Sequence, residues 1–259
     1  LTYPDGKRVT YAFDNAGRLG QVSDWSSRVT NYAYDPASML SGQANANGTT
    51  VAFAYDNAGR LISMTNKKSD LSVISSYSFT LDQVGNRTNI SQTEPIVAGN
   101  PAVDTTYSYN AANQIQTAGP TTFTSDFNGN LKTQTTGANT RTFNYDFEDR
   151  LVTGTDGTTS AQYIYNGDGR RVAKTINGST TRFVLDPTSR LPRVLAETTA
   201  SGAITSYYTH GLGMISKVSA NGQAYQYHFD VRGSTIAITN NAQSIVNRYS
   251  YDPFGSVIG

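Results

Sequence analysis

The sequence predicts an all-β protein built as a strip of antiparallel β-hairpins, and three observations lead to this prediction. Two aromatic residues at alternate positions, followed by Asp-x-x-Gly, recur along the whole chain about every twenty residues. Glycine-containing turn signals lie about midway between these motifs. No window of eleven or more residues shows the apolar spacing of an amphipathic helix.

The composition excludes several classes of protein. Of the 259 residues 37% are hydrophobic and 15% charged, and 20 Lys+Arg against 19 Asp+Glu leave a net charge of +1. This balance does not favour a nucleic-acid binder, while 17 tyrosines argue against a disordered tail. The absence of cysteine excludes disulfides, thiolate metal sites and cysteine nucleophiles. No apolar run approaches the length of a membrane span.

Twelve copies of the motif can be aligned, with Asp, Asn or His in the Asp position. The clearest copies run from Tyr11 to Leu19 and from Phe53 to Leu61. The Asp positions are Asp14, Asp35, Asp56, Asp82, Asn110, Asp126, Asp146, Asn166, Asp186, His210, Asp230 and Asp252. The residues that we assign to the structural motif are Tyr11, Phe13, Asp14, Gly17, Leu19, Tyr32, Tyr34, Asp35, Phe53, Tyr55, Asp56, Gly59, Leu61, Asp230, Gly233, Tyr251, Asp252 and Gly255.

Each residue type in the motif has a structural role in a strand or a turn. Tyr11 and Phe13 are two residues apart, so on a strand both rings point to one face. The Asp14 carboxylate can accept a hydrogen bond from the amide two residues further on and so stabilise a turn. Gly17 suits the left-handed position that closes a type I turn with a bulge, and Leu19 then begins the returning strand. Asp-x-x-Gly therefore predicts a hairpin turn.

Alternating turns of two kinds predict a continuous antiparallel meander of about two dozen strands. The second kind of turn contains dipeptides such as Asn47-Gly48 and Asn221-Gly222. One longer loop is expected from Gln92 to Thr106, where prolines, glycines and small residues gather. An open sheet of this length must curl, split or close. A spiral strip, a large barrel and a propeller are all possible, and the similarity of all units favours the spiral.

The stretch from Phe53 to Leu61 resembles the YD repeat of the RHS (rearrangement hot-spot) family. The stretch from Tyr227 to Thr235, followed by Tyr249 to Gly255, resembles the start of the RHS-associated core region of that family. The resemblance implies that residues 1–259 are a YD/RHS repeat region within a longer chain, and that residues 227–259 begin the core region. It also implies that the spiral strip is part of a hollow shell.

In bacterial toxin complexes and RHS effectors such a shell encloses a toxic C-terminal domain, and a related shell occurs in animal teneurins. The resemblance therefore implies a structural shell segment that encapsulates an attached polypeptide. The expected partners are the rest of its own chain and a second shell-forming or delivery protein, and the expected location is secreted or at the bacterial cell surface. The family's aspartyl autoprotease would lie downstream, so no catalytic residue is assigned.

Other interpretations of the repeated residues are less favoured. Calcium sites need denser acidic ligands than one Asp per repeat, and neither His210 nor His228 has the neighbours of a zinc site or a catalytic triad. We therefore expect no metal, no cofactor and no enzyme activity in this segment. The tyrosines favour a ladder of cross-strand pairs. An alternative is an adhesin whose tyrosines stack on glycans.

Overall fold

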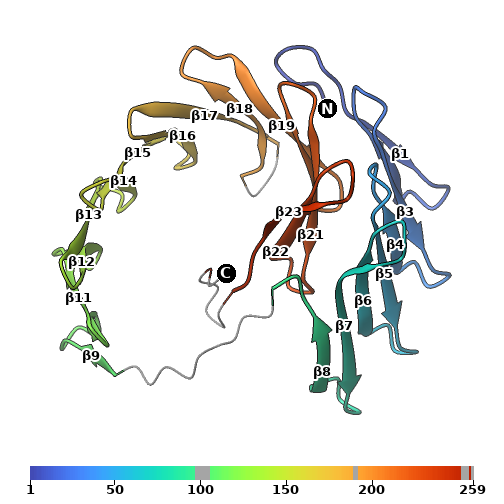
Figure 1. Ribbon diagram of the computed structural model, residues 1–259, viewed down its shortest axis with the longest axis horizontal. Helices are drawn as coiled ribbons and strands as arrows, with labels where there is room; N and C mark the ends of the chain where they lie inside the picture. Colours follow the sequence, from blue (N-terminus) through green and yellow to red (C-terminus); the bar gives the residue numbers. More distant parts are fainter. Residues whose placement is uncertain (97–105, 189–191, 252–256, 258–259) are drawn as a thin grey trace. The chain divides into compact units, whose positions relative to one another are not determined.

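The computed structural model describes residues 1–96, 106–188, 192–251 and 257. Across these residues it contains β-strands and turns and no helix, so the predicted all-β class is confirmed. The strands form open sheets of antiparallel hairpins that do not close into a barrel (Figure 1). Every neighbouring pair of strands with a recorded register is antiparallel, for example β1 with β2.

The described strands belong to two sheets, and in each the order in space is the order in sequence. The eight-stranded sheet contains β1 (Thr10–Phe13), β2 (Leu19–Ser23), β3 (Val29–Tyr34), β4 (Leu40–Ala44), β5 (Thr50–Tyr55), β6 (Leu61–Lys67), β7 (Val73–Leu81) and β8 (Arg87–Thr93). The fifteen-stranded sheet contains β9 (Tyr107–Tyr109), β10 (Ile115–Ala118), β11 (Thr121–Ser125), β12 (Leu131–Thr136), β13 (Asn139–Tyr145), β14 (Leu151–Thr155), β15 (Ser160–Tyr165), β16 (Arg171–Ile176), β17 (Ser179–Leu185), β18 (Val194–Thr199), β19 (Ile204–His210), β20 (Met214–Ser219), β21 (Ala224–Phe229), β22 (Thr235–Thr239) and β23 (Ile245–Arg248).

Among the described residues the predicted meander is interrupted at one place, between β8 and β9, where the longer loop was expected and where the two sheets separate. The predicted loop also began too early, because Gln92 and Thr93 still pair with β7. Residues 97–105 of that loop lie outside the described residues, as do the motif residues Asp252 and Gly255. Pro95, two residues after the end of β8, has no amide hydrogen to donate to a strand ladder.

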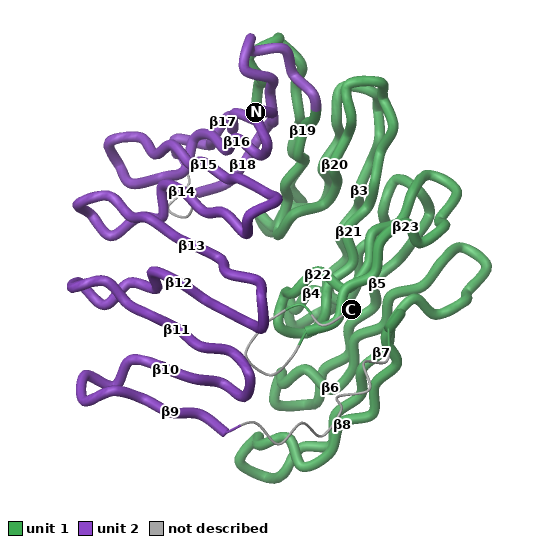
Figure 2. The backbone as a smooth tube through the Cα atoms, turned by 60° about the vertical axis from the view of Figure 1, so that its left-hand side comes forward, with its two compact units in different colours: residues 1–100, 206–259 green, residues 101–205 purple. Residues whose placement is uncertain are grey.

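The chain divides into two compact units, shown in Figure 2. Unit 1 contains Leu1–Asn100 together with Ser206–Gly259, and unit 2 contains Pro101–Thr205. Unit 1 is thus assembled from two segments that are distant in sequence, whereas unit 2 is one continuous segment. This division was not evident from the composition, which does not change at either boundary.

The core of unit 1 lies on the aromatic face of the eight-stranded sheet. Val51, Met64, Tyr77 and Phe79 form a buried cluster there, and Phe53 packs against it. The register places these residues on one face, because Phe53 pairs with Met64 and Met64 pairs with Tyr77. Alanine and serine residues occupy the opposite face, so the alternation of the motif sets which side is buried.

A second layer of strands, β19 to β23, belongs to the same unit. On this layer Tyr207, Val218, Ala224 and His228 are buried. Side chains of the first layer bond to its backbone: the Tyr3 hydroxyl donates to the Tyr208 carbonyl at 2.8 Å, and Asn47 Nδ2 donates to the Asn240 carbonyl at 2.9 Å. Unit 1 therefore contains two layers of strands that bond to each other through side chains.

Unit 2 separates its side chains by chemistry. One face carries an aromatic residue from every second strand, including Phe123, Phe143 and Tyr163. The other face carries hydroxyl groups that bond across the strands, as between Thr124 and Thr133 at 2.6 Å and between Thr135 and Thr140 at 3.0 Å. Threonine is β-branched and can bond to its cross-strand neighbour, so it stabilises the strands without a hydrophobic core beneath it.

Candidate functional site

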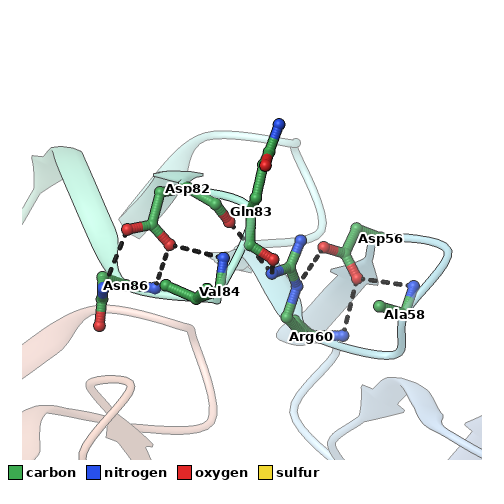
Figure 3. A network of polar contacts seen from close by, with 7 residues as sticks. All are labelled: Asp56, Ala58, Arg60, Asp82, Gln83, Val84 and Asn86. Carbon is green, nitrogen blue, oxygen red and sulfur yellow. Dashed lines mark hydrogen bonds and ion pairs between the residues drawn. The ribbon is translucent and has the colours of Figure 1, made fainter.

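The Asp-x-x-Gly turn closes as the motif predicts. In the turn at Asp56, Oδ1 accepts hydrogen bonds from the amides of Ala58 at 3.0 Å and Arg60 at 2.9 Å (Figure 3). Oδ2 accepts from Arg60 Nε at 2.7 Å. The Gly59 amide donates to the Asp56 carbonyl, and Gly59 has a φ of +75°. One carboxylate thus holds both the backbone reversal and the arginine side chain.

The same pair of amide contacts recurs in ten turns of the described residues. In each, the side-chain oxygen accepts from the amides two and four residues further on. The acceptors with both contacts are Asp14, Asp24, Asp56, Asp82, Asn110, Asp126, Asp146, Asn166, Asp230 and Asn240. Because asparagine makes these contacts as well as aspartate, the position requires an oxygen acceptor and not a charge.

Hydrogen bonds to the ionised form hold the carboxylates charged. The amide of Arg60 lowers the pKa of the Asp56 carboxyl below its ordinary value, and the Arg60 side chain lowers it further. The amide and side chain of Arg18 do the same to the pKa of Asp14. An acceptor held in the ionised form suits a structural turn, whereas a general acid needs a raised pKa.

The left-handed position of the turn is kept even where glycine is replaced. Ser38 has a φ of +67°, Asn113 of +59° and Asp149 of +58°, against +75° for Gly17. Asparagine and aspartate tolerate this conformation better than most residues do. The turn geometry is therefore imposed by the surrounding hydrogen bonds and not only by glycine.

Neighbouring turns are bonded to one another along the sheet edge. Arg60 Nη1 donates to the Asp82 carbonyl of the next turn at 3.1 Å (Figure 3). Arg18 Nη1 donates to Ser38 Oγ at 3.0 Å, also one turn further on. The arginine of the motif therefore has two roles, since it neutralises its own Asp and reaches the following repeat. We call this chain of linked Asp turns the turn ladder.

The second tyrosine of the motif adds another link between repeats. The Tyr34 hydroxyl donates to the Leu19 carbonyl at 2.9 Å, and the Tyr55 hydroxyl donates to the Leu40 carbonyl at 3.0 Å. Both leucines are the Leu position of the preceding repeat. The same contact joins later repeats, namely Tyr165 to Leu151 and Tyr251 to Thr235.

This tyrosine contact could not be read from a single motif, because its two partners lie in different repeats. The pairing of β2 with β3 begins only at Gln21, so the Leu19 carbonyl lies beyond the ladder of backbone bonds. A bulge or strand end leaves such a carbonyl in need of a donor. The sequence signal is the pairing of Leu in one repeat with Tyr fifteen residues later, as in Leu19 and Tyr34.

His228 is the one histidine that the structure buries completely. Its Nε2 lies 2.9 Å from Thr239 Oγ1, and burial lowers the pKa of the imidazole to about 4. The His228 ring lies on the face of β21 opposite to Tyr227 and Phe229. Within the described ranges no three acidic, histidine or cysteine residues gather as a metal site would require.

One depression on unit 2 is lined by aromatic rings, and cations lie close to these rings. This depression, of about 340 Å³, is one of at least two in unit 2 and is lined by residues that include Tyr165, Arg171 and Phe183. The Arg171 guanidinium lies 5.3 Å from the centre of the Tyr163 ring and 5.6 Å from that of Phe183. Because cations already cover these rings, stacking on a sugar is not favoured there, and glycan binding stays a prediction.

The family described as Teneurin YD-shell matches residues 75–259, and the RHS Repeat family matches residues 34–69. This chain belongs to the teneurin YD-shell family of RHS/YD-repeat proteins. The predicted resemblance is confirmed, and the turn ladder lies within the matched residues as well as before them.

Two curated relatives share a short stretch with this YD-shell chain. It is 34% identical over 82 residues to the tRNA3(Ser)-specific nuclease WapA of Bacillus spizizenii and 33% identical over 82 residues to the tRNA nuclease WapA of Bacillus subtilis. In both cases the stretch covers 31% of this chain and 3% of the relative. The likeness thus concerns a repeat region and only a small part of each nuclease.

Solved structures of toxin complexes have a similar fold over 98% of this chain. The Tc holotoxin pore of Photorhabdus luminescens with a TccC3 mutation gives a TM-score of 0.51 at 18% identity, and a TcdB2-TccC3 complex gives 0.50 at 17%. The YD-shell chain spans 18% and 19% of those chains. At these identities the likeness is one of fold. In the described part of the chain no helix has the length and hydropathy needed to cross a membrane.

Proposed function

We propose that this chain is a wall segment of an RHS shell that encloses a polypeptide attached to its own longer chain. The turn ladder is the observation that carries this proposal, because it joins successive repeats by side-chain bonds that no single hairpin could provide. A strip linked in this way resists separation of its strands. Such resistance is what a container needs and what an enzyme site does not require.

The partners and location follow from the same proposal. A second shell-forming or delivery protein is expected, as in the solved TcdB2-TccC3 complex. In this proposal the motif residues that stabilise the wall are the turn residues, such as Asp14, Asp56 and Asp230. We further propose that residues 227–259 begin a core region and that the protein is secreted or held at the cell surface.

Protection from proteolysis tests this function in the full-length protein. We expect the polypeptide downstream of the repeats to survive protease treatment in the intact protein and to be digested when it is expressed without the repeats. Equal digestion in both forms would contradict encapsulation. A matched pair of variants sharpens the test. Asp56→Ala, which removes the acceptor of the two amides and the acceptor of Arg60 Nε, should increase digestion of the downstream segment more than Asp56→Asn, which keeps an acceptor for the two amides.

A further inference from the structure

Two phenylalanine rings stand fully exposed at the tips of neighbouring turns in unit 2. Phe127 follows Asp126 and Phe147 follows Asp146, and both side chains are as exposed as in an extended chain, at 111% and 107%. Large apolar groups are rarely left in water on adjacent rigid turns unless another surface covers them. Both rings occupy the position directly after the Asp of the motif, which we call the tip position.

Phenylalanine is unusual at the tip position of this chain. The other repeats have small, polar or proline residues there, with one exception, Val231. These residues are Asn15, Pro36, Asn57, Gln83, Ala111, Gly167, Pro187, Gly211 and Pro253. The turn itself therefore does not require an apolar tip residue, and the two phenylalanines need another explanation.

Val231 shows what an apolar tip residue does in this fold. It packs against the buried cluster of the facing layer, which contains Val51, Met64, Tyr77 and Phe79. This turn is also anchored by Asn66 Nδ2, which donates to the carbonyl of Phe229 at 3.3 Å. A partly buried apolar tip thus packs against the aromatic face of a facing layer of strands.

The turns that carry Phe127 and Phe147 are held in a fixed relation. Asn128 Nδ2 and Asn130 Nδ2, in the first turn, both donate to Asp149 Oδ1 in the second, at 3.0 and 2.7 Å. The two tips are separated by one hairpin, which is two strand spacings or about 10 Å. A repeat sheet presents its own aromatic residues on every second strand, at the same interval of about 10 Å.

We propose that Phe127 and Phe147 dock together on the aromatic face of another YD-repeat sheet, contributed by repeats of the same shell beyond residues 1–259. This proposal rests on the proposed shell function, because it needs a further layer of wall. The shared interval makes a repeat sheet a better fit than an irregular polypeptide, since both rings can enter equivalent gaps between aromatic rows. The Val231 contact within unit 1 is the example of the same geometry.

Photocross-linking in the full-length protein tests the docking. Benzoylphenylalanine would replace Phe127 or Phe147, and the matched control would carry it at Asn57, which is also a tip position. We expect cross-links from both phenylalanine positions to the aromatic-x-aromatic strands of repeats outside residues 1–259, at several times the yield from Asn57. Cross-links to a second copy, to the enclosed polypeptide, or at no more than the Asn57 yield would overturn the proposal.

A pair of charged substitutions gives a second measurement. Phe127→Asp with Phe147→Asp should lower the midpoint of thermal unfolding of the full-length protein, whereas Asn57→Asp with Gln83→Asp should leave it nearly unchanged. Equal midpoints for the two double variants would contradict the docking. Protease protection of the downstream segment, measured on the unsubstituted protein, reports separately on the shell function, so failure of one proposal is distinguishable from failure of the other.

Discussion

The loss of stability caused by removing the side-chain acceptor at an Asp position depends on how deeply that side chain is buried. Asp230 is 4% exposed, and its Oδ1 accepts from the amides of Arg232 and Ser234, both at 2.8 Å. Water cannot readily replace an acceptor at such a position, so the two amides would be left without partners. The Asp14 side chain is more exposed, so water can reach the corresponding amides of Ala16 and Arg18.

Asp230→Ala is therefore expected to lower the free energy of unfolding by about 2 kcal/mol, the cost of leaving buried donors unpaired. Asp230→Asn keeps the oxygen, as Asn110 and Asn166 do in their own turns, and should cost less than about 1 kcal/mol. Denaturant unfolding followed by circular dichroism measures both. Equal losses for the two variants would show that charge, and not the acceptor, holds the turn.

The left-handed position of the turn gives a second comparison between single residues. No atom lies within 4 Å of a Cβ built on Gly59, so any cost of substitution there comes from its φ of +75°. Gly59→Val should lower the free energy of unfolding by about 1–2 kcal/mol. Ser38 already has a Cβ at a φ of +67°, so Ser38→Val should cost less. Thermal unfolding of both variants checks that this position of the turn is left-handed. Equal shifts of the two unfolding midpoints would contradict it.

Among elements, the type of turn decides which face of the sheet an aromatic pair occupies. Tyr207 pairs with Val218, and Val218 pairs with Ala224. The buried face therefore continues in His228, and Tyr227 lies on the opposite face. A shift of one residue in a hairpin moves every following side chain to the other face.

In unit 2, two successive repeats with the same spacing keep their aromatic residues, Tyr163 and Phe183, on one face of the sheet. Tyr163 pairs with Lys174, Lys174 pairs with Thr181, and that face continues in Phe183. The Asp positions are equally spaced in the two cases, since 186 − 166 and 230 − 210 are both 20. The difference is the turn between the strands.

The same dipeptide forms both turns. Asn177 and Gly178 both have positive φ, of +47° and +80°, as in a two-residue hairpin turn. At the second Asn-Gly only Gly222 has positive φ, and its amide bonds to the Ser219 carbonyl in a longer turn. The strands, the Asp turns and the repeat can therefore be predicted from the local sequence. The face on which His228 falls cannot, because the same Asn-Gly dipeptide forms turns of two lengths.

The burial of His228 has a consequence for pH. Its pKa is about 4 in the folded protein against 6.5 in the unfolded chain. Between these values the unfolded chain binds a proton and the folded protein does not, so stability falls as the pH drops below 6.5. The loss between pH 7 and pH 5 should be about 2 kcal/mol.

Denaturant unfolding at pH 7 and pH 5, followed by Trp25 fluorescence, measures this loss. Trp25 is the chain's single tryptophan and contacts Tyr3 and Tyr207 of unit 1, so its emission reports on that unit. His228→Gln should remove most of the pH dependence in this range. The turn carboxylates, whose pKa values are lowered, matter only at lower pH. An unchanged loss in the variant would assign the effect to another group.

On the scale of the whole molecule, the two units differ in how far apart in sequence their contacting segments lie. Unit 1 needs both Leu1–Asn100 and Ser206–Gly259, and Lys7 Nζ bonds to the Tyr207 hydroxyl at 2.6 Å across a separation of 200 residues. Unit 2 pairs each strand with its neighbour in sequence. Closing a long loop costs entropy before any contact is gained, so distant pairing slows folding.

Refolding from denaturant should consequently show two phases. The far-ultraviolet signal of the hairpins is expected to recover first, because most strands pair with sequence neighbours, and Trp25 fluorescence later, when the second layer covers the first. Tyr207→Ala, which removes a ring 4.7 Å from that of Trp25, should slow or diminish the late phase. Tyr208→Ala, on the opposite face of the same strand, is the control. Simultaneous recovery of both signals would show that the layers form together with the hairpins and that sequence separation does not limit the assembly of unit 1.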